Sequence, residues 1–461
     1  MGQPIPLPIA SYDQPSRLPL RLINVYPEKT PSGKQQVGLL GAPGAAAFAA
    51  PGNGPGRGLF VMRGILYAVS GQTFYKVDDQ GSETPLGNLS GSGKLMFAGN
   101  GTQIVFSNKF IFDGGSVSPI TDPDLPAISA VDYVDGYVVW AESGTQRWGC
   151  SKLYAGGDYD LLDTSEAEVW PDDIVTLKVD HRQVILFGQE RTEIWWNSAP
   201  EGGTIFPFER LAGGDIEYGC LARLGVAKQD NSVFWISNDR TIRRLSGQTP
   251  QRVSHHGVEQ KLSRYVRIDD CEAFPITWNG HLWVVFNFPS AQGVGVGATW
   301  VFDVTVQEWH ERSTYGLQHW NVVDSAICYG GKVFVQSATT GAIAVLNDRT
   351  FTEFGGTLRR SWTYPQVYGS NRPMVHGALE MEMRTGDAPL GELGHVHLEV
   401  SDDGGNTYTS VPPRTLGRTG EYSHTIRWNR LGQAKDRVYR ASVDDAHVPV
   451  ALNDTLLTVE G

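Results

Sequence analysis

The sequence predicts an all-β protein: a β-propeller of about six or seven blades, with an extended N-terminal arm before it and a β-sandwich-like domain after it. Glycine is frequent, with 54 residues, and the 461-residue chain holds 13 Trp, 17 Tyr and 18 Phe. Glycine supplies the positive φ of tight turns, and aromatic side chains suit half-buried strand faces. Short alternating strands recur along the middle of the chain, and the pattern changes near residue 351.

Residues 1–58 are expected to form the arm, because Pro and Gly punctuate them throughout, as in PIPLPIA and RLINVYPEKTPSG. Proline fixes φ and removes a backbone donor, so this segment should be neither a regular helix nor a central strand. We expect it to lie extended on another surface, and a flexible leader is the alternative.

Residues 59–350 repeat a unit of apolar and aromatic strands joined by turns, as in GILYAVSGQTFYKVDDQG and QVILFGQERTEIWWNS. Alternation with Gly, Asn or Asp at the turns is typical of antiparallel hairpins. Successive units begin roughly 35 to 50 residues apart, the period of four-stranded propeller blades. A pair of β-sandwiches or a β-helix would compete, but the aromatics recur once or twice in each unit and no short hexapeptide period is visible.

Residues 351–461 contain longer alternating strands without the blade period, such as HVHLEVSDDGGNTYTS and RVYRASVDD. They predict a β-sandwich-like domain that packs on the propeller or is interwoven with it. Almost no helix is expected. The best helical candidate is VEQKLSRY, residues 258–265, with one or two turns.

Composition excludes several classes of function. The net charge of −12 argues against a surface that grips phosphates, although DNA could still pass without sticking. Cys150, Cys220, Cys271 and Cys328 form no CxxC or Cys/His cluster, so we expect buried thiols in a reducing compartment. The N-terminus lacks the pattern of a signal peptide and no apolar run is long enough to span a membrane, so we expect a soluble, non-exported protein with no membrane-spanning segment.

Residues 401–410 read SDDGGNTYTS and carry a pattern that resembles the Asp-box hairpin of sialidase propellers. The pattern residues are Ser401, Asp403, Gly405, Thr407 and Tyr408. It occurs once and outside the predicted blades, whereas sialidases repeat it within several blades. In such a hairpin the Asp and Thr side chains bond to the turn backbone and the aromatic ring packs beneath. We therefore interpret these five residues as a structural hairpin with no catalytic role.

No cofactor or metal site is predicted. GNGPGRG lacks the Lys-Ser/Thr pair of a phosphate-binding loop, and GVGVG lies in a hairpin connection. His255, His256 and Glu259 are close in sequence, but we place them in a connection between blades. His395 and His397 share a strand face, and a hydrogen-bonded surface pair explains them better than a metal.

No catalytic residues are predicted either. A sialidase needs several arginines that converge on the substrate carboxylate, together with a tyrosine nucleophile. Arginines cluster here in two pairs, Arg243-Arg244 and Arg359-Arg360, which we interpret as charges at strand edges. The sequence thus predicts that the protein is not an enzyme.

Residues Thr192–Leu262, with phrases such as IEYGC and VFWIS, resemble the blade sequences of a phage family. This is the packaged-DNA stabilisation protein, or tail nozzle (tail hub), of short-tailed bacteriophages (podoviruses). The N-terminal RLINVYPEKTPSGKQQVGLLGAPG and the C-terminal segment from RTGEYSHTIRW to the end are similar to the same family.

The resemblance implies a structural virion protein that assembles in the cytoplasm of the bacterial host. It implies a homo-hexameric ring at the distal end of the tail, which conducts DNA during ejection and helps retain the packaged genome. The implied partners are the tail adaptor below the portal, a tailspike or fibre, a plug or needle at the tip, and passing double-stranded DNA without specific binding. The alternative function is a carbohydrate-binding or carbohydrate-cleaving propeller, such as a receptor-binding tail protein, and a generic interaction propeller is the third.

Physical reasoning suggests how such a ring would work. Part of the negative charge is expected to face the channel, because an acidic wall repels the duplex and lets it slide. Retention would then need a mechanical closure. The long connections Pro200–Gly214 and Pro289–Ala298 are candidates for that closure or for docking partners.

Overall fold

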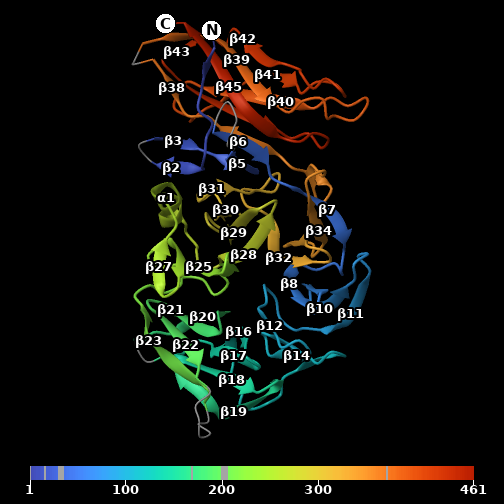
Figure 1. The fold of residues 1–461 in the computed structure, drawn as a ribbon, viewed down its shortest axis with the longest axis vertical. Coiled ribbons are helices and arrows are strands. Elements are labelled where there is room, and N and C mark those ends of the chain that lie inside the picture. Colours follow the sequence, from blue (N-terminus) through green and yellow to red (C-terminus); the bar gives the residue numbers. More distant parts are fainter. Residues whose placement is uncertain are drawn as a thin grey trace.

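The computed structural model describes residues 2–14, 17–29, 36–167, 170–198, 206–369 and 372–460. They form a propeller, coloured mostly from blue to light orange in Figure 1, with a β-sandwich at one end, whose strands are orange to red apart from dark blue strands of the N-terminal arm. The first and last described strands, β1 (Gln3–Pro4) and β45 (Ala451–Glu460), pair with each other in the sandwich. Within the described ranges α1 (His256–Arg264) is the only helix, so the predicted all-β class is confirmed.

Five blades are separate four-stranded antiparallel sheets, each built from strands that follow one another in the sequence. Their strands are β8 (Gly56–Met62), β9 (Ile65–Ser70), β10 (Thr73–Val77) and β11 (Glu83–Asn88); β12 (Phe97–Gly99), β13 (Ile104–Phe106), β14 (Phe110–Phe112) and β15 (Val117–Pro119); β16 (Ile128–Val134), β17 (Tyr137–Glu142), β18 (Arg147–Lys152) and β19 (Ala155–Glu166); β20 (Ile174–Asp180), β21 (Gln183–Gly188), β22 (Thr192–Asn197) and β23 (Phe208–Ile216); and β24 (Val226–Gln229), β25 (Ser232–Ile236), β26 (Ile242–Ser246) and β27 (Thr249–Arg252).

Two further blades share their sheets with the rest of the chain. One consists of β28 (Glu272–Trp278), β29 (His281–Phe288), β30 (Ala298–Asp303) and β31 (Glu308–Glu311). The other consists of β32 (Val322–Cys328), β33 (Lys332–Ser337), β34 (Ile343–Asn347) and, paired with β34, the N-terminal strand β7 (Gly44–Ala49). This blade closes the ring, because its innermost strand β32 lies against β8. Counted over the described residues, seven innermost strands surround the axis, within the predicted six or seven.

Aromatic side chains fill the spaces between neighbouring blades. The rings of Trp148 and Trp195 meet edge to face with centroids 5.2 Å apart, and those of Phe187 and Trp235 lie 5.5 Å apart. All four side chains are buried. The recurring aromatics that predicted the blades therefore form the contacts that hold adjacent blades together.

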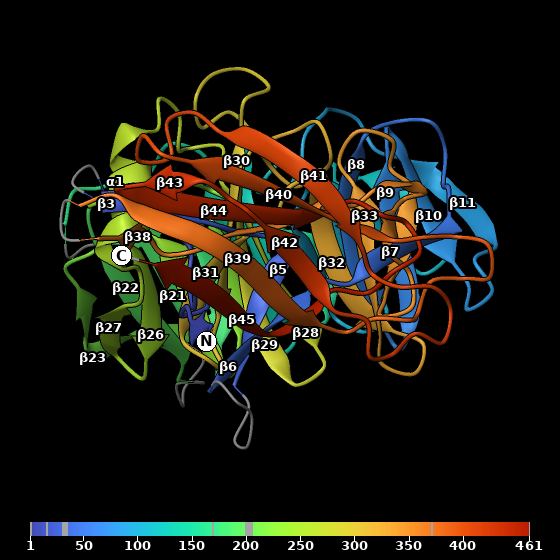
Figure 2. The same cartoon turned by 90° about the horizontal axis from the view of Figure 1, so that it is seen from above.

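The C-terminal region forms the sandwich, whose long strands cross over one end of the propeller in Figure 2. One sheet has the order β42-β39-β45-β6-β5, with β1 and β43 at its side, and the other continues from the propeller through β37-β44-β40-β41, with β38 beside β44. The strands are β5 (Val25–Lys29), β6 (Val37–Gly41), β37 (Arg360–Thr363), β38 (Val367–Tyr368), β39 (Met374–Met383), β40 (His395–Ser401), β41 (Thr409–Thr415), β42 (Ile426–Asn429), β43 (Gln433–Ala434) and β44 (Asp436–Val443).

The N-terminal arm is woven into both parts of the molecule. Strand β4 (Leu22–Ile23) lies between β31 of a blade and β37 of the sandwich, so one ten-stranded sheet runs through both. Strand β6 lies inside the other sandwich sheet, and β7 lies between β34 and the short β35 (Thr352–Glu353), which pairs with β36 (Gly356–Thr357). The remaining strands, β2 (Tyr12–Gln14) and β3 (Arg17–Leu20), form a hairpin beside α1.

The expectation that the arm holds no central strand is therefore wrong. The interior strands of the arm, β4, β6 and β7, contain no proline. Pro27 lies in β5, which is the edge strand of its sheet. An edge strand tolerates a missing backbone donor, whereas an interior strand does not.

Several smaller expectations can be compared with the fold. Helix α1 begins two residues before the predicted segment, because the His255 ring accepts hydrogen bonds from the backbone nitrogens of Gly257 and Val258 and so caps it. The four cysteines are free and buried, as predicted. No described helix is long and apolar enough to cross a membrane.

The two long connections lie inside blades and not between them. Pro289–Ala298 joins β29 to β30 within one blade. Residues 200–205 of the other segment, Pro200–Gly214, lie outside the described residues, and its described part is largely strand β23, the fourth strand of its blade.

Asn24 secures the arm where it passes between the two parts. Its side-chain nitrogen donates to the carbonyl oxygens of Ser313 in the propeller and Arg359 in the sandwich, at 2.8 Å each. Its side-chain oxygen accepts from the Ser313 backbone nitrogen at 3.1 Å, and its φ of 55° is left-handed. Asparagine tolerates that φ better than most residues and also supplies these bonds.

We predict that Asn24→Ala lowers the free energy of unfolding by about 3 kcal/mol, since three buried hydrogen bonds are worth about 1 kcal/mol each. Asn24→Gly should be less damaging, because glycine adopts positive φ freely. The measurement is urea-induced unfolding. Asn279→Gly is the matched control, because Asn279 is exposed with a φ of 46°. Equal stability of N24G and N279G would show that the Asn24 bonds contribute nothing.

Candidate functional site: a cleft where arm, propeller and sandwich meet

The hairpin between β40 and β41 carries the five Asp-box-like residues. The Asp403 carboxylate accepts from the Thr407 hydroxyl at 2.5 Å, from the Thr407 backbone nitrogen at 2.9 Å and from the Ser401 hydroxyl at 2.7 Å. The Ser401 hydroxyl in turn accepts from the Gly405 backbone nitrogen at 2.8 Å. Hydrogen bonds from Thr407 and Ser401 hold the pKa of Asp403 at about 2.

Tyr408 points away from this turn toward strand β44. Its ring stacks against the guanidinium of Arg440, whose central carbon lies 3.7 Å from the ring centroid. Burial raises the pKa of the Tyr408 hydroxyl, so the phenol stays protonated. The aromatic position of the hairpin thus contacts a cation on a neighbouring strand and orients it.

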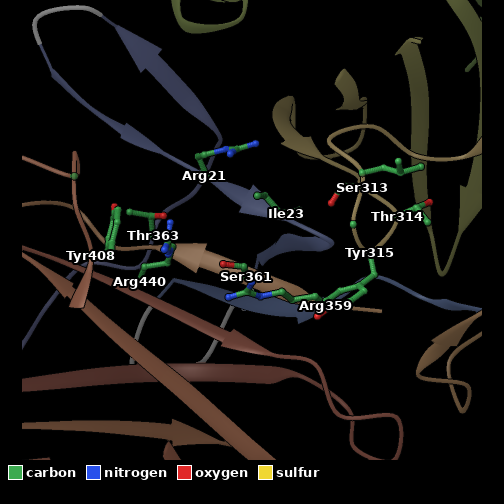
Figure 3. Close-up of a pocket in the computed structure, with 13 residues that line it drawn as sticks. Arg21, Ile23, Ser313, Thr314, Tyr315, Arg359, Ser361, Thr363, Tyr408 and Arg440 are labelled. Atoms are coloured by element: carbon green, nitrogen blue, oxygen red, sulfur yellow. The ribbon is translucent and has the colours of Figure 1, made fainter. Parts of the chain in front are cut away.

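The hairpin and this stacked pair form one wall of a cleft of about 400 Å³, drawn in Figure 3. The arm, a propeller loop and the sandwich each contribute side chains to it. The lining residues are Arg21, Ile23, Ser313, Thr314, Tyr315, Gly316, Leu317, Arg359, Ser361, Thr363, Gly405, Tyr408 and Arg440. A cleft of this size at a junction of structural units is a usual place for a ligand or partner.

Three arginines from three separate parts of the chain reach this cleft. Arg21 donates to both carboxylate oxygens of Glu311, at 3.1 and 2.6 Å, and this carboxylate raises the pKa of the Arg21 guanidinium. Arg440 donates to Glu399 at 2.7 Å. Arg359 donates to the Ser442 hydroxyl at 3.1 Å, with Glu399 at 3.9 Å.

All three arginines therefore line one cleft, although the sequence indicated only scattered pairs. The assignment of both pairs to strand edges is also wrong for Arg243 and Arg360, which are buried. One part of the cleft could have been predicted from the sequence. Side chains alternate along strand β37, so Arg359, Ser361 and Thr363 fall on one face and Arg360 on the other. Arg21 lies hundreds of residues from Arg359 in the sequence, and Arg440 lies tens of residues from it. No local pattern connects the three.

The centre of the propeller, where a propeller enzyme would carry its site, holds paired charges. A smaller cavity of about 230 Å³ there is lined by residues of all the innermost strands. Lys178 pairs with Asp132 at 3.1 Å and Lys228 with Asp180 at 2.8 Å. Lys94 lies 3.5 Å from Asp324. These lysines are thus committed to structural ion pairs.

The histidine candidates have local partners. His255 caps α1, and Glu259 in that helix pairs with Arg252 of strand β27. His397 lies 3.3 Å from Asp444, whereas His395 faces Thr415 across the strand pair. Across the described residues no group of three His, Cys, Asp or Glu side chains is placed to hold a metal ion.

Comparison with known families matches almost the whole chain. A model described as "Bacteriophage P22 Gp10, beta-propeller" matches residues 13–351, and one described as "Bacteriophage P22 Gp10, beta-sandwich" matches residues 360–460. No curated protein sequence matches the chain.

Solved structures align with this chain only at low TM-scores. The computationally designed protein Ika8 is 14% identical over 65% of this chain and 99% of its own, with a TM-score of 0.40. BamB from Moraxella catarrhalis is 13% identical over 71% of this chain and 97% of its own, with a TM-score of 0.36. An exo-β-1,3-galactanase from Phanerochaete chrysosporium is 11% identical over 90% of this chain and 99% of its own, with a TM-score of 0.32. At these scores none carries an argument about function.

The Asp403 bonds predict a pH dependence of stability. Because the pKa of Asp403 in the fold is below its ordinary value, its contribution is present above about pH 4 and is lost as the pH falls toward about 2. As the pH falls across this interval, the Tm of the Asp403→Asn variant should therefore fall less than the Tm of the unmodified chain. Asp348→Asn, at an exposed carboxylate, is the control. Parallel curves for all three proteins would contradict the prediction.

Proposed function

Because this chain belongs to the bacteriophage P22 Gp10 family of phage structural proteins, we propose that it is the tail nozzle of a short-tailed phage. Six copies form a ring at the distal end of the tail, conduct DNA during ejection and help to retain the packaged genome. The observation that carries this proposal is the match over both the propeller and the sandwich, residues 13–351 and 360–460. The protein acts in the virion after assembly in the host cytoplasm.

The role is structural and not enzymatic. The family is a structural one, and the lysines that line the propeller centre pair with aspartates, as Lys178 does with Asp132. The Asp403 hairpin serves the turn itself, since its carboxylate is bonded to Ser401 and Thr407. The neighbours of the ring are the tail adaptor below the portal, a tailspike or fibre, and a plug or needle at the tip.

The excess of negative charge suits a conduit. The chain carries 50 acidic against 38 basic residues, and a channel wall that repels phosphates lets the duplex slide under pressure. At physiological salt this repulsion extends over about 8 to 10 Å, which is enough to keep DNA from adhering to the wall. Retention is then the work of a mechanical closure at the tip.

A reconstitution experiment tests this function. Phage particles that carry the portal and adaptor but lack this protein should lose their DNA, and adding the purified full-length chain should restore retention. Release is measured as nuclease-sensitive DNA, and cryo-electron microscopy should show a ring of this chain at the tail tip with an acidic inner wall. Portal particles without the adaptor are the control and should bind no ring.

One result would overturn the proposal and another would overturn its sliding mechanism. If the chain binds elsewhere on the particle, or leaves release unchanged, it is not the nozzle. If the ring forms but its inner wall is predominantly basic, the sliding mechanism fails while the assembly role stands.

A further inference from the structure

The cleft at the junction exposes guanidinium groups whose donors are only partly used. Arg440 uses its Nε for Glu399, and its two terminal nitrogens have no partner among the described residues. Arg359 uses Nη2 for Ser442, and its Nε and Nη1 likewise have none in the described part of the chain. The Arg440 and Arg359 side chains are 34% and 45% exposed, so a ligand can reach them.

The lining of the cleft carries positive charge and no acidic residue. Three guanidinium groups, those of Arg21, Arg359 and Arg440, line it. Asp13 acts on Arg21 and Asp403 acts on Tyr408 from nearby, while Glu311 and Glu399 pair with the arginines directly. Both glutamates lie behind the arginines and do not line the cleft. They and the Tyr408 ring fix the arginines in place, so little side-chain freedom remains to be lost when a ligand binds.

The lining favours a ligand that is rich in hydrogen-bond acceptors. None of the thirteen lining residues is Asp, Glu, Asn or Gln; the polar ones are arginines, hydroxyl-bearing Ser and Thr, and tyrosines. The hydroxyl groups can accept as well as donate, but the guanidinium groups only donate, and a carboxylate suits them better than a neutral sugar does because the pairing is charge-assisted. A nucleic acid is disfavoured, because its binding depends on neutralising many phosphates and the cleft offers three guanidinium groups only.

We propose that this cleft binds an aspartate or glutamate side chain presented by a second copy of the chain. The inference rests on the proposed ring, in which each subunit must offer its neighbour a different, complementary surface. With 50 acidic against 38 basic residues, a second copy has an excess of carboxylates to offer this cleft. Tyr315 and Leu317, 57% and 40% exposed at the cleft, supply apolar contact around the ion pair.

Ring assembly by the full-length chain on portal–adaptor particles provides the first test. The double variant R359Q/R440Q should raise the concentration needed for ring formation by more than about tenfold, because it removes charge-assisted bonds from a subunit contact. Its Tm should stay close to that of the unmodified chain, since both side chains are partly exposed. Arg349→Gln, at an exposed arginine away from the cleft, is the matched control and should assemble normally.

Cross-linking identifies the occupant. The variant R440K places an amine in the cleft, and a zero-length carbodiimide joins such an amine only to a carboxyl group in direct contact. In rings mixed from isotopically heavy and light chains, we expect a cross-linked peptide that joins residue 440 of one copy to an Asp or Glu of a differently labelled copy. The control R349K should give no such product.

The outcomes separate this inference from the proposed function. If the unmodified chain forms rings and R359Q/R440Q forms them equally well, the cleft is not a subunit contact, although the nozzle stands. A cross-link to a different tail protein, or saturable binding of N-acetylneuraminic acid with no effect on rings, would replace the second copy as the occupant. If the unmodified chain forms no ring at all, the nozzle and the second-copy contact both fail.

Discussion

The passage of a two-residue strand between the propeller and the sandwich governs the rest of the structure. Strand β4 pairs through Ile23 with Glu311 of a blade on one side and with Ser361 of the sandwich on the other. Asn24, directly after it, donates to carbonyl oxygens on both sides. Because one sheet continues through this strand, the sandwich cannot rotate on the propeller without breaking backbone hydrogen bonds.

Buried charges gather where the arm, the last blade and the sandwich meet. Burial lowers the pKa of both Arg312 and Arg360 to about 10, and burial raises the pKa of Glu353. Arg312 lies over the Trp320 ring at 4.2 Å, and Trp320 donates to Glu353 at 2.8 Å. Buried ionic groups contribute little net stability, and their known value is to favour one arrangement of the elements over others. At this junction they would fix how the sandwich sits on the propeller, as a ring of subunits requires.

Local patterns predicted most of the fold but little of the cleft. Alternating strands and turns located the blades, and the Asp403 hairpin and helix α1 were visible in short segments. The prediction for the arm was wrong. Prolines mark residues that cannot lie in a central strand, but the segments between the prolines can form one, as β4, β6 and β7 do. The meeting of Arg21, Arg359 and Arg440 depends on strand pairings over hundreds of residues, which a local pattern does not encode.

The proposed nozzle function would require subunits that keep their shape while DNA passes under pressure, and a rigid junction between propeller and sandwich would serve that purpose. The central claim is that the threaded arm makes the two parts a single cooperative unit. Differential scanning calorimetry of the full-length chain tests it most directly. The account predicts one endotherm whose calorimetric and van't Hoff enthalpies agree. Two resolved transitions, with the sandwich melting while the propeller remains folded, would contradict it.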